Sequence, residues 1–225
     1  MTREQLAAAV TERLEQRYPN AKYELNFESP FQLLIATILA AQATDERINQ
    51  VTPILFGKWP TPQALADADQ TELETVLIPT GFYKRKAKAV KETSKGLLEL
   101  FGGEVPQTVD QLVQLHGVAR KTANVVLNTA FNIPSGIIVD THVQRVSRRI
   151  GLTDTENPDQ IEQELMPLVP EARWTQFGPA MVLLGRYTCT AKVVKCSECV
   201  MNDVCEKRYP PAEKVAKDTK ETEPT

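Results

Sequence analysis

The stretch LHGVARKTANVVL, residues 115 to 127, decides how the chain around it folds. Leu115 ends one helical pattern, Gly117 permits a backbone with positive φ, and a second helical pattern begins near Ala119 or Arg120. The stretch therefore predicts two helices joined by a tight hairpin. Because the first turn of a helix exposes unpaired N–H groups, such a hairpin can bind a phosphate through its backbone.

Two polar residues near this hairpin are candidates for chemistry. Lys121 stands in the first turn of the second helix, where the helix dipole disfavours an ammonium, and a neutral amine can form a Schiff base with a sugar carbon. Asp140 follows in the segment IIVDTH and is predicted to cap the next helix. If both groups face one site, the carboxylate would stabilise positive charge on a sugar. A plain helix connection, an exposed lysine and a simple cap are the alternative interpretation.

The rest of the chain has the pattern of an all-α protein. Apolar residues recur at helical spacing, aromatic residues make up 6%, and the one Ile-Ile-Val run lies in the segment 132–140, which we interpret as a buried linker between domains. In the helix beginning at residue 83, Ala87 and Val90 are expected to face inward and the lysines outward. Helices are predicted at residues 3–18, 30–42, 44–57, 62–68, 71–77, 83–102, 106–115, 141–152, 158–170 and 177–189.

Composition and charge indicate a protein with a buried core and no membrane-spanning segment. With 42% hydrophobic and 24% charged residues, the chain can bury a core, and no apolar run is long enough to span a membrane. The N-terminal segment lacks the features of a secretion signal, so we expect an intracellular protein. The net charge is −3, yet the window from Thr80 to Asn124 holds eight cations and four anions, so this window carries +4 and the remainder −7. A polyanion would be bound locally, although a solvated lysine face is the commoner explanation of such a run.

The four cysteines are clustered in a C-x6-C-x2-C-x5-C pattern near the C-terminus. Four thiolates from one loop fit either a tetrahedral zinc ion or a cubane iron–sulfur cluster, and the spacing alone does not choose between them. Disulfides are not expected in an intracellular chain. The predicted ligands are Cys189, Cys196, Cys199 and Cys205.

Three motifs in order resemble the endonuclease III family of DNA glycosylases and abasic-site lyases, within the helix-hairpin-helix superfamily. They are the hairpin LHGVARKTANVVLNTAF, the segment VDTH at residues 139–142, and the cysteine pattern. The resemblance covers roughly residues 23–205 and includes LLIATILAAQATD and GFYKRKA. It implies an all-α protein with two helical domains and a DNA cleft between them. A six-helix, barrel-like domain would span residues 22–135, and residues 1–21 with 136–206 would form a domain with a 4Fe-4S cluster. Residues 207–225 are predicted to be a disordered tail.

The resemblance also implies the activity and the roles of individual residues. The protein would remove oxidised pyrimidines such as thymine glycol from duplex DNA, as a monomer in base excision repair, in the bacterial cytoplasm with the nucleoid. Lys121 would attack the sugar C1′ and form a Schiff base that undergoes β-elimination, and Asp140 would be its electrostatic and acid/base partner. The target nucleotide would leave the base stack. The implied DNA-contacting residues are Gln42, Phe82, His116, Gly117, Val118, Ala119, Arg120 and His142.

The chain departs from the family pattern at a few positions. The family hairpin usually reads L-P-G-V-G, whereas His116 and Ala119 replace the proline and the second glycine here. The Ala119 methyl is expected to crowd a bound phosphate. Phe82 stands where an aliphatic residue is common, and Ala40 stands where a serine is often found. These differences concern damage preference and opposite-base preference.

Two rival functions are considered. The adenine glycosylase branch of the superfamily has a serine at the position of Lys121 and an acid at the position of Thr37, and it usually carries a further C-terminal domain, so the chain resembles it less. A non-catalytic DNA-binding protein with a purely structural cluster is the other possibility. The joint presence of Lys121 and Asp140 disfavours it, and absence of strand cleavage would support it.

Overall fold

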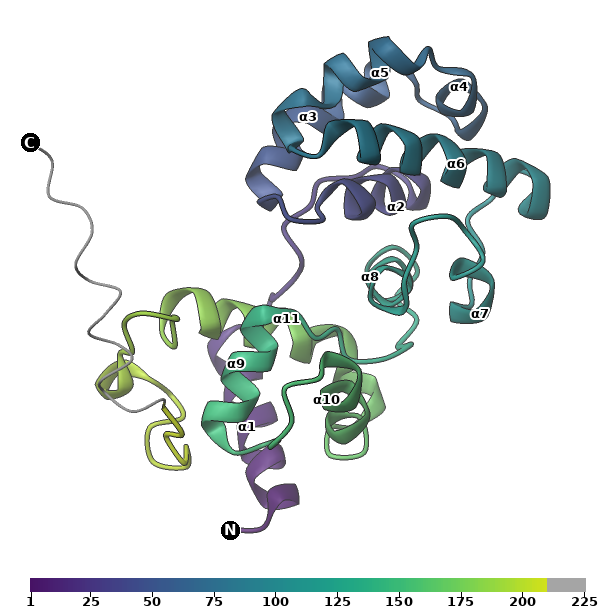
Figure 1. Cartoon of the computed structure of the whole chain (residues 1–225). Helices are drawn as coiled ribbons and strands as arrows, with labels where there is room; N and C mark the ends of the chain where they lie inside the picture. Colours follow the sequence, from purple (N-terminus) through teal and green to yellow (C-terminus); the bar gives the residue numbers. More distant parts are fainter. Residues whose placement is uncertain (210–225) are drawn as a thin grey trace, which may run out of the picture. The chain divides into compact units, whose positions relative to one another are not determined.

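The computed structural model describes residues 1–209, and the chain divides into two compact units (Figure 1). One unit is continuous and spans residues 22–136. The other is discontinuous, because it combines residues 1–21 with the chain from residue 137 onward. The division falls inside the segment 132–140, which forms no strand and buries Ile137 and Ile138, as predicted for a buried linker.

The described residues are helices and connecting loops, which confirms the predicted all-α fold. No β-sheet occurs among them, and their one strand-like pairing is an isolated bridge between Cys189 and Val194. Within residues 1–209, no helix is both long enough and apolar enough to cross a lipid bilayer.

The unit of residues 22–136 is built around the long helix α6, which packs against α2, α4 and α5 (Figure 1). Helix α2 also packs against α3 and α8, and the short α7 packs against α8. The helices are α2 (Pro30–Leu39), α3 (Asp45–Lys58), α4 (Pro62–Asp67), α5 (Gln70–Leu77), α6 (Tyr83–Phe101), α7 (Val109–Leu112) and α8 (Arg120–Ala130). A 3-10 turn, Ile78–Thr80, joins α5 to the loop before α6.

Local chemistry explains where several of these helices begin and end. The Ser29 hydroxyl accepts a hydrogen bond from the Gln32 N–H at 3.2 Å, and Pro30 occupies the first helical position of α2. The Thr44 hydroxyl caps α3 in the same way. Helix α6 ends where Gly102 takes a left-handed conformation, with φ of 62°. These caps were predictable from sequence because each depends on neighbouring residues only.

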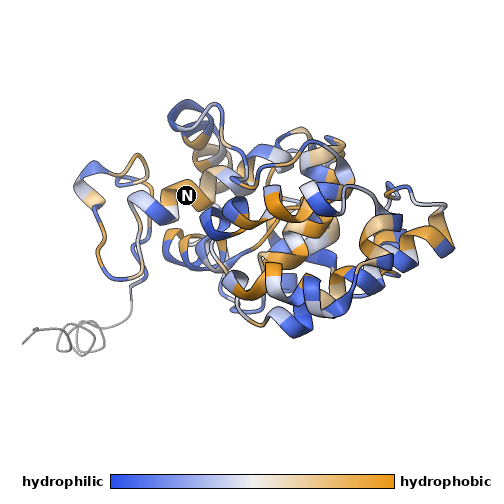
Figure 2. Cartoon of the chain, turned by 90° about the horizontal axis from the view of Figure 1, so that it is seen from above, coloured by the Kyte–Doolittle hydropathy of each residue, from blue (hydrophilic) through white to orange (hydrophobic). Residues whose placement is uncertain are grey.

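The core of this unit is centred on α2. Leu33, Leu34, Ile35 and Leu39 are fully buried, which explains why this helix is apolar over most of its surface. Hydrophobic residues lie along the packed faces of the helices, and hydrophilic residues lie along their outward faces (Figure 2).

The discontinuous unit packs the N-terminal helix against the last long helix. Helix α11 contacts both α1 and α9. The helices of this unit are α1 (Arg3–Arg17), α9 (Thr141–Ile150), α10 (Pro158–Leu165) and α11 (Trp174–Tyr187). The unit also contains two 3-10 turns: Glu171–Arg173 immediately precedes α11, and Cys196–Glu198 lies beyond its end. Its buried core includes Val10, Leu14, Val143, Phe177 and Met181.

Three sequence predictions need correction. The helix predicted at 106–115 is regular only over Val109–Leu112, because the residues on both sides form turns. Not all lysines of α6 face outward, since Lys86 is only 5% exposed. Lys207 and Tyr209, at the start of the tail predicted to be disordered, make defined contacts. Residues 210–225 lie outside the described part of the chain.

We predict that Leu34→Ala lowers the free energy of unfolding of the 22–136 unit by about 2–5 kcal/mol, because Leu34 has no exposed surface and the substitution leaves a cavity. Leu100→Ala is the matched control, since Leu100 is 54% exposed in the same unit, and its effect should stay within about 0.5 kcal/mol. Denaturant unfolding followed by circular dichroism measures both. Equal losses in the two variants would contradict the assignment of the core.

Candidate nucleic-acid site and cysteine cluster

The predicted hairpin is present between α7 and α8. The Val118 N–H donates to the Leu115 carbonyl at 3.2 Å, which closes the turn, and Gly117 has φ of 77°. An L side chain is strained in that conformation, so the glycine is required here. Helix α8 begins at Arg120 with Ala119 as its N-cap, as the sequence predicts.

Helix α6 holds the hairpin in place through close packing and one buried hydroxyl. The Thr93 hydroxyl lies 2.6 Å from the His116 carbonyl and 2.8 Å from the Ala89 carbonyl, and it shares its proton between them. Thr93 is fully buried. A Cβ placed on Gly117 would lie 3.5 Å from the Ala89 Cβ, so the turn rests directly on the helix. The hydrogen bond to the His116 carbonyl and the packing of Gly117 on Ala89 together fix the position at which α8 starts.

Lys121 lies in the first turn of α8 and is exposed. Because Ala119 provides no side-chain cap, the helix start depends on other groups to satisfy its N–H donors. Four predicted hairpin contacts, His116, Gly117, Ala119 and Arg120, are also exposed. The side chain of Val118 is buried instead, so only its backbone borders the surface. The exposed surface of the hairpin can therefore bind an anion, and the Lys121 amine lies on the same surface.

The alanine at position 119 fits the backbone without strain. Its φ of −93° and ψ of 169° describe an extended conformation that any residue adopts. A glycine is therefore not needed at this position to form the turn. Any effect of the extra methyl group would come from contact with a ligand.

Asp140 belongs to the discontinuous unit and caps α9, as predicted. Its Oδ1 accepts hydrogen bonds from the N–H groups of His142 at 2.8 Å and Val143 at 2.9 Å. Both cap bonds end on Oδ1, and Oδ2 accepts none from the described residues. His142 is half-buried, and its Nδ1 lies 3.2 Å from the Arg145 guanidinium, which donates to the Gly185 carbonyl at 2.8 Å. The cap thus orients a carboxylate that keeps one oxygen available.

Gln42 and Phe82 share an unusual backbone conformation. Gln42 has φ of 54° and Phe82 has φ of 48°, both in the left-handed region that non-glycine residues seldom adopt. Both side chains are exposed, Phe82 at 62%. No sequence pattern indicated these conformations, because neither residue is of a type that favours them.

Two buried asparagines of α8 tether the segment that leaves the 22–136 unit. The Asn128 amide donates to the Gly136 carbonyl at 2.8 Å, and its carbonyl accepts from the Ser135 N–H at 3.1 Å. The Ser135 hydroxyl also bonds Asn124 at 2.9 Å. Sequence analysis missed these residues. Their spacing of four, on either side of the apolar run Val125–Leu127, was the available signal, since buried amides need partners.

The four cysteines line one cavity beyond the end of α11. Burial is the main cause that raises the pKa of Cys199 and of Cys205, and the neighbouring thiols raise the pKa of each further. Within residues 1–209, no three His, Cys, Asp or Glu side chains converge tightly enough to hold a single metal ion.

Each cysteine sulfur has a hydrogen-bonding partner. Cys199 Sγ accepts from the Met201 N–H at 3.4 Å, and Cys205 Sγ accepts from the Lys207 N–H at 3.3 Å. The other two bonds come from side chains: the Arg149 guanidinium donates to Cys189 Sγ at 3.5 Å, and the Tyr209 hydroxyl lies 2.8 Å from Cys196 Sγ. Such donors suit thiolate ligands of an iron–sulfur cluster, and sulfurs spread around a cavity suit a cluster of several atoms.

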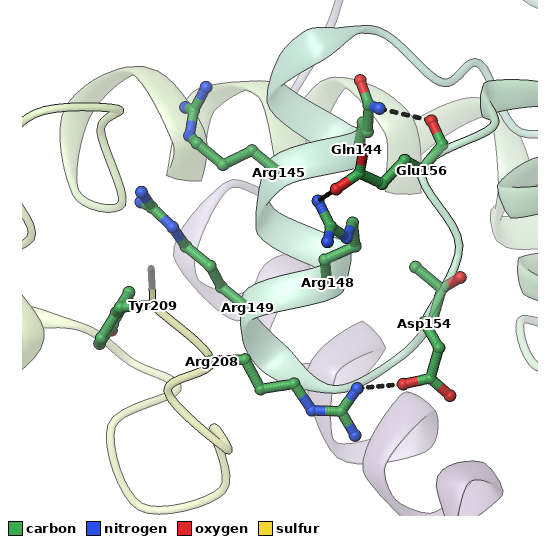
Figure 3. A pocket seen from close by; sticks show the side chains of 9 residues that line it. Gln144, Arg145, Arg148, Arg149, Asp154, Glu156, Arg208 and Tyr209 are labelled. Atoms are coloured by element: carbon green, nitrogen blue, oxygen red, sulfur yellow. Dashed lines mark hydrogen bonds and ion pairs between the residues drawn. The ribbon is translucent and has the colours of Figure 1, made fainter. Parts of the chain in front are cut away.

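An arginine-rich face of α9 supports the cysteine loop. Arg145, Arg148 and Arg149 project from this helix, and Arg149 is directed toward Tyr209 (Figure 3). The Arg149 guanidinium lies 5.3 Å from the centre of the Tyr209 ring and donates to the Thr190 carbonyl at 2.7 Å. Arg208 pairs with Asp154 on the same face.

The loop is also tied to the N-terminal helix. Arg13 donates to the Val200 carbonyl at 2.8 Å and forms an ion pair with Asp203. The hydrogen bond from Arg13 is the main cause that lowers the pKa of Asp203 to about 2. This pair joins residues nearly two hundred positions apart, so α1 is part of the support of the cysteine loop.

Comparison with known proteins places the chain in a family. Residues 35–171 match the model of the HhH-GPD superfamily of base excision DNA repair proteins. Endonuclease III of Synechocystis sp. is 45% identical over 91% of this chain and 93% of its own length. Endonuclease III of Escherichia coli K12 is 42% identical over 86% of this chain and 92% of its own length.

A solved structure has the same fold. A trapped covalent intermediate of endonuclease III with DNA matches with a TM-score of 0.86 and 38% identity, over 92% of this chain and 97% of that one. Together with the hairpin, the capping aspartate and the four-cysteine loop, these similarities show that the chain belongs to the endonuclease III family of the HhH-GPD superfamily.

Proposed function

We propose that the protein is a bifunctional DNA glycosylase and abasic-site lyase that removes oxidised pyrimidines from duplex DNA in base excision repair. The observation that carries the proposal is the exposed Lys121 in the first turn of α8, directly after a hairpin whose helix start offers free N–H groups to an anion. A helix start of this kind brings a phosphate and an amine to neighbouring positions. The covalent intermediate solved for a related endonuclease III supports an enzyme-bound step.

The proposed chemistry begins with the neutral Lys121 amine. Its Nζ attacks C1′ of the damaged nucleotide, the bond from C1′ to the base breaks, and the base leaves with a proton. Ring opening gives a protonated imine between Nζ and C1′. Loss of a proton from C2′ then breaks the C3′–O bond, and the phosphate departs. Hydrolysis of the imine returns the free lysine.

Asp140 is proposed to assist at the same nucleotide. Its Oδ1 is held by the two backbone N–H groups of α9, so the carboxylate is oriented before substrate binds. Oδ2 would stabilise the positive charge that develops on the sugar and accept a proton during elimination. Preorganisation of this kind avoids reorientation during the reaction.

Recognition of the lesion is proposed to require extrusion of the nucleotide from the stack. Gln42 and Phe82 would fill the gap, since both are exposed on strained backbones that fix their direction. The hairpin residues 116–120 would bind a backbone phosphate, and His142 would lie near the opposed strand. The protein would act as a monomer on the chromosome.

We further propose that the two units serve as separate domains. Residues 22–135 would be the helix-hairpin-helix domain, and residues 1–21 with 136–206 would hold a 4Fe-4S cluster through Cys189, Cys196, Cys199 and Cys205. The common cavity and the donors to all four sulfurs support this assignment. When bound, such a cluster crosslinks the loop and provides a redox-active group.

We predict that Lys121→Gln abolishes covalent trapping by borohydride, because reduction captures only an imine on the lysine amine. The experiment uses a duplex with one thymine glycol and a second duplex with one abasic site. Wild-type protein should be trapped on both, and Lys95→Gln, an exposed lysine of α6, should behave like wild type. Trapping by the Lys121 variant would remove this lysine from its role, and no trapping by wild type would favour a protein that only binds DNA.

We predict that Asp140→Asn and Asp140→Ala distinguish the role of Asp140 as a helix cap from its proposed role in base release. Asparagine and aspartate are equally good helix caps, so Asp140→Asn should leave the free energy of unfolding nearly unchanged. Asp140→Ala removes the cap and should lower the free energy of unfolding by about 1 kcal/mol. Both should slow base release roughly 10²-fold or more, because the charge is lost. Thermal unfolding and single-turnover kinetics measure the two effects. Normal base release by Asp140→Asn would mean that the residue is only a cap.

The cluster assignment is tested by metal analysis of purified protein. Iron and inorganic sulfide in equal amounts, with a broad visible absorption, are expected. Cys199→Ser should lower the iron content and the stability of the discontinuous unit, because the loop loses its crosslink. Ser197→Ala, on the adjacent 3-10 turn, is the control. Stoichiometric zinc in colourless protein would contradict the assignment.

A further inference from the structure

Lys86 is a buried lysine with no carboxylate partner. It lies in the first turn of α6 and is 5% exposed, whereas its neighbours Lys84 and Lys88 are exposed. Burial lowers the pKa of Lys86. No acidic side chain of residues 1–209 forms an ion pair with it. An uncompensated buried ammonium costs folding free energy, so stability alone does not account for a lysine here.

The ammonium is directed at the loop before α6. Lys86 Nζ donates to the Thr80 carbonyl at 2.7 Å, and this carbonyl is its one acceptor among the described residues. An ammonium carries three N–H donors, so two of them gain nothing from the protein. Thr80 is itself buried, and its hydroxyl donates to the Leu77 carbonyl at 2.8 Å, so the acceptor sits on a fixed turn.

Lys86 binds the chain on both sides of Gly81. Its backbone N–H donates to the Phe82 carbonyl at 3.0 Å, while its side chain holds the Thr80 carbonyl. Between these two anchor points, Gly81 and Phe82 have φ of 69° and 48°. A phenylalanine in the left-handed region is strained, and it persists only where its surroundings enforce it. The backbone bond is an ordinary helical bond that any residue other than proline makes at this position, so the contribution specific to the lysine is the hydrogen bond from its side chain to the Thr80 carbonyl.

We infer that Lys86 is a positioning residue that fixes the exposed Phe82 side chain for insertion into the base stack. The inference rests on the proposed function, in which Phe82 fills the gap left by the extruded nucleotide. It explains why a costly buried ammonium is hydrogen-bonded to the strained loop that carries an exposed aromatic ring. Residues that hold a functional group in place commonly lower stability in exchange for activity.

Lys86→Met tests the inference, because methionine fills the apolar space of the lysine stem and lacks the donor. The matched control is Lys88→Met, which removes an exposed lysine from the same helix. The probe is a duplex with a tetrahydrofuran abasic analogue and 2-aminopurine in the opposite strand, whose fluorescence rises when the stack opens. Lys86→Met should lose most of this rise, whereas Lys88→Met should keep it.

Kinetics and stability distinguish positioning from a merely structural role. Turnover of thymine glycol by Lys86→Met should fall roughly tenfold or more, since a misplacement of about 1 Å can cost 10²-fold. Trapping on a preformed abasic site should fall less, and the unfolding midpoint should stay the same or rise. A lowered midpoint with normal fluorescence and turnover would overturn the inference. If Lys86→Met does not fold, Lys86→Leu, which also lacks a donor, supplies the same comparison.

A double-mutant cycle with Phe82→Ala completes the test. If Lys86 acts through Phe82, adding Lys86→Met to Phe82→Ala should cause no further loss of fluorescence or turnover. Additive losses would overturn the inference. Wild-type protein that neither traps nor opens the duplex would instead refute the proposed function, so the two failures are distinguishable.

Discussion

The hydrogen bond between the Thr93 hydroxyl and the His116 carbonyl, with the contact of Gly117 on Ala89, sets the geometry on which the candidate site depends. It holds the hairpin against α6 and thereby determines where α8 begins. The position of Lys121 follows, because a residue in the first turn of a helix has little freedom once the helix start is fixed. A glycine and a buried threonine therefore control the placement of an exposed amine.

Much of the fold could be predicted because it depends on neighbouring residues. The caps at Ser29, Thr44 and Asp140 and the hairpin at Gly117 involve only groups within a few positions of each other. The clustering of four cysteines likewise predicted that they would meet at one place, and they line one cavity. Helix bounds were less accurate, because the last turn of a helix depends on what packs against it.

The features that sequence analysis missed depend on distant contacts. Lys86 belongs to the same helical stripe as Val90 and Leu97, but lysine was assigned to the surface by residue type. The left-handed conformations of Gln42 and Phe82 contradict the preferences of those residues. Tyr209 falls in a stretch whose composition favours disorder, yet its hydroxyl reaches Cys196 and its ring lies under Arg149. In each case tertiary packing overrides a local preference.

The discontinuity of the second unit has a consequence for synthesis on the ribosome. Residues 22–136 emerge as one complete unit that can fold before α11 is made, whereas α1 is made before this unit and finds its partner α11 only after residue 187 has been made. During that interval Leu6, Val10 and Leu14 lack the surface that later buries them. The nascent chain therefore carries an unpaired amphipathic helix on the N-terminal side of the 22–136 unit, and the cysteine loop, which Arg13 supports, is the last part of the described chain to assemble.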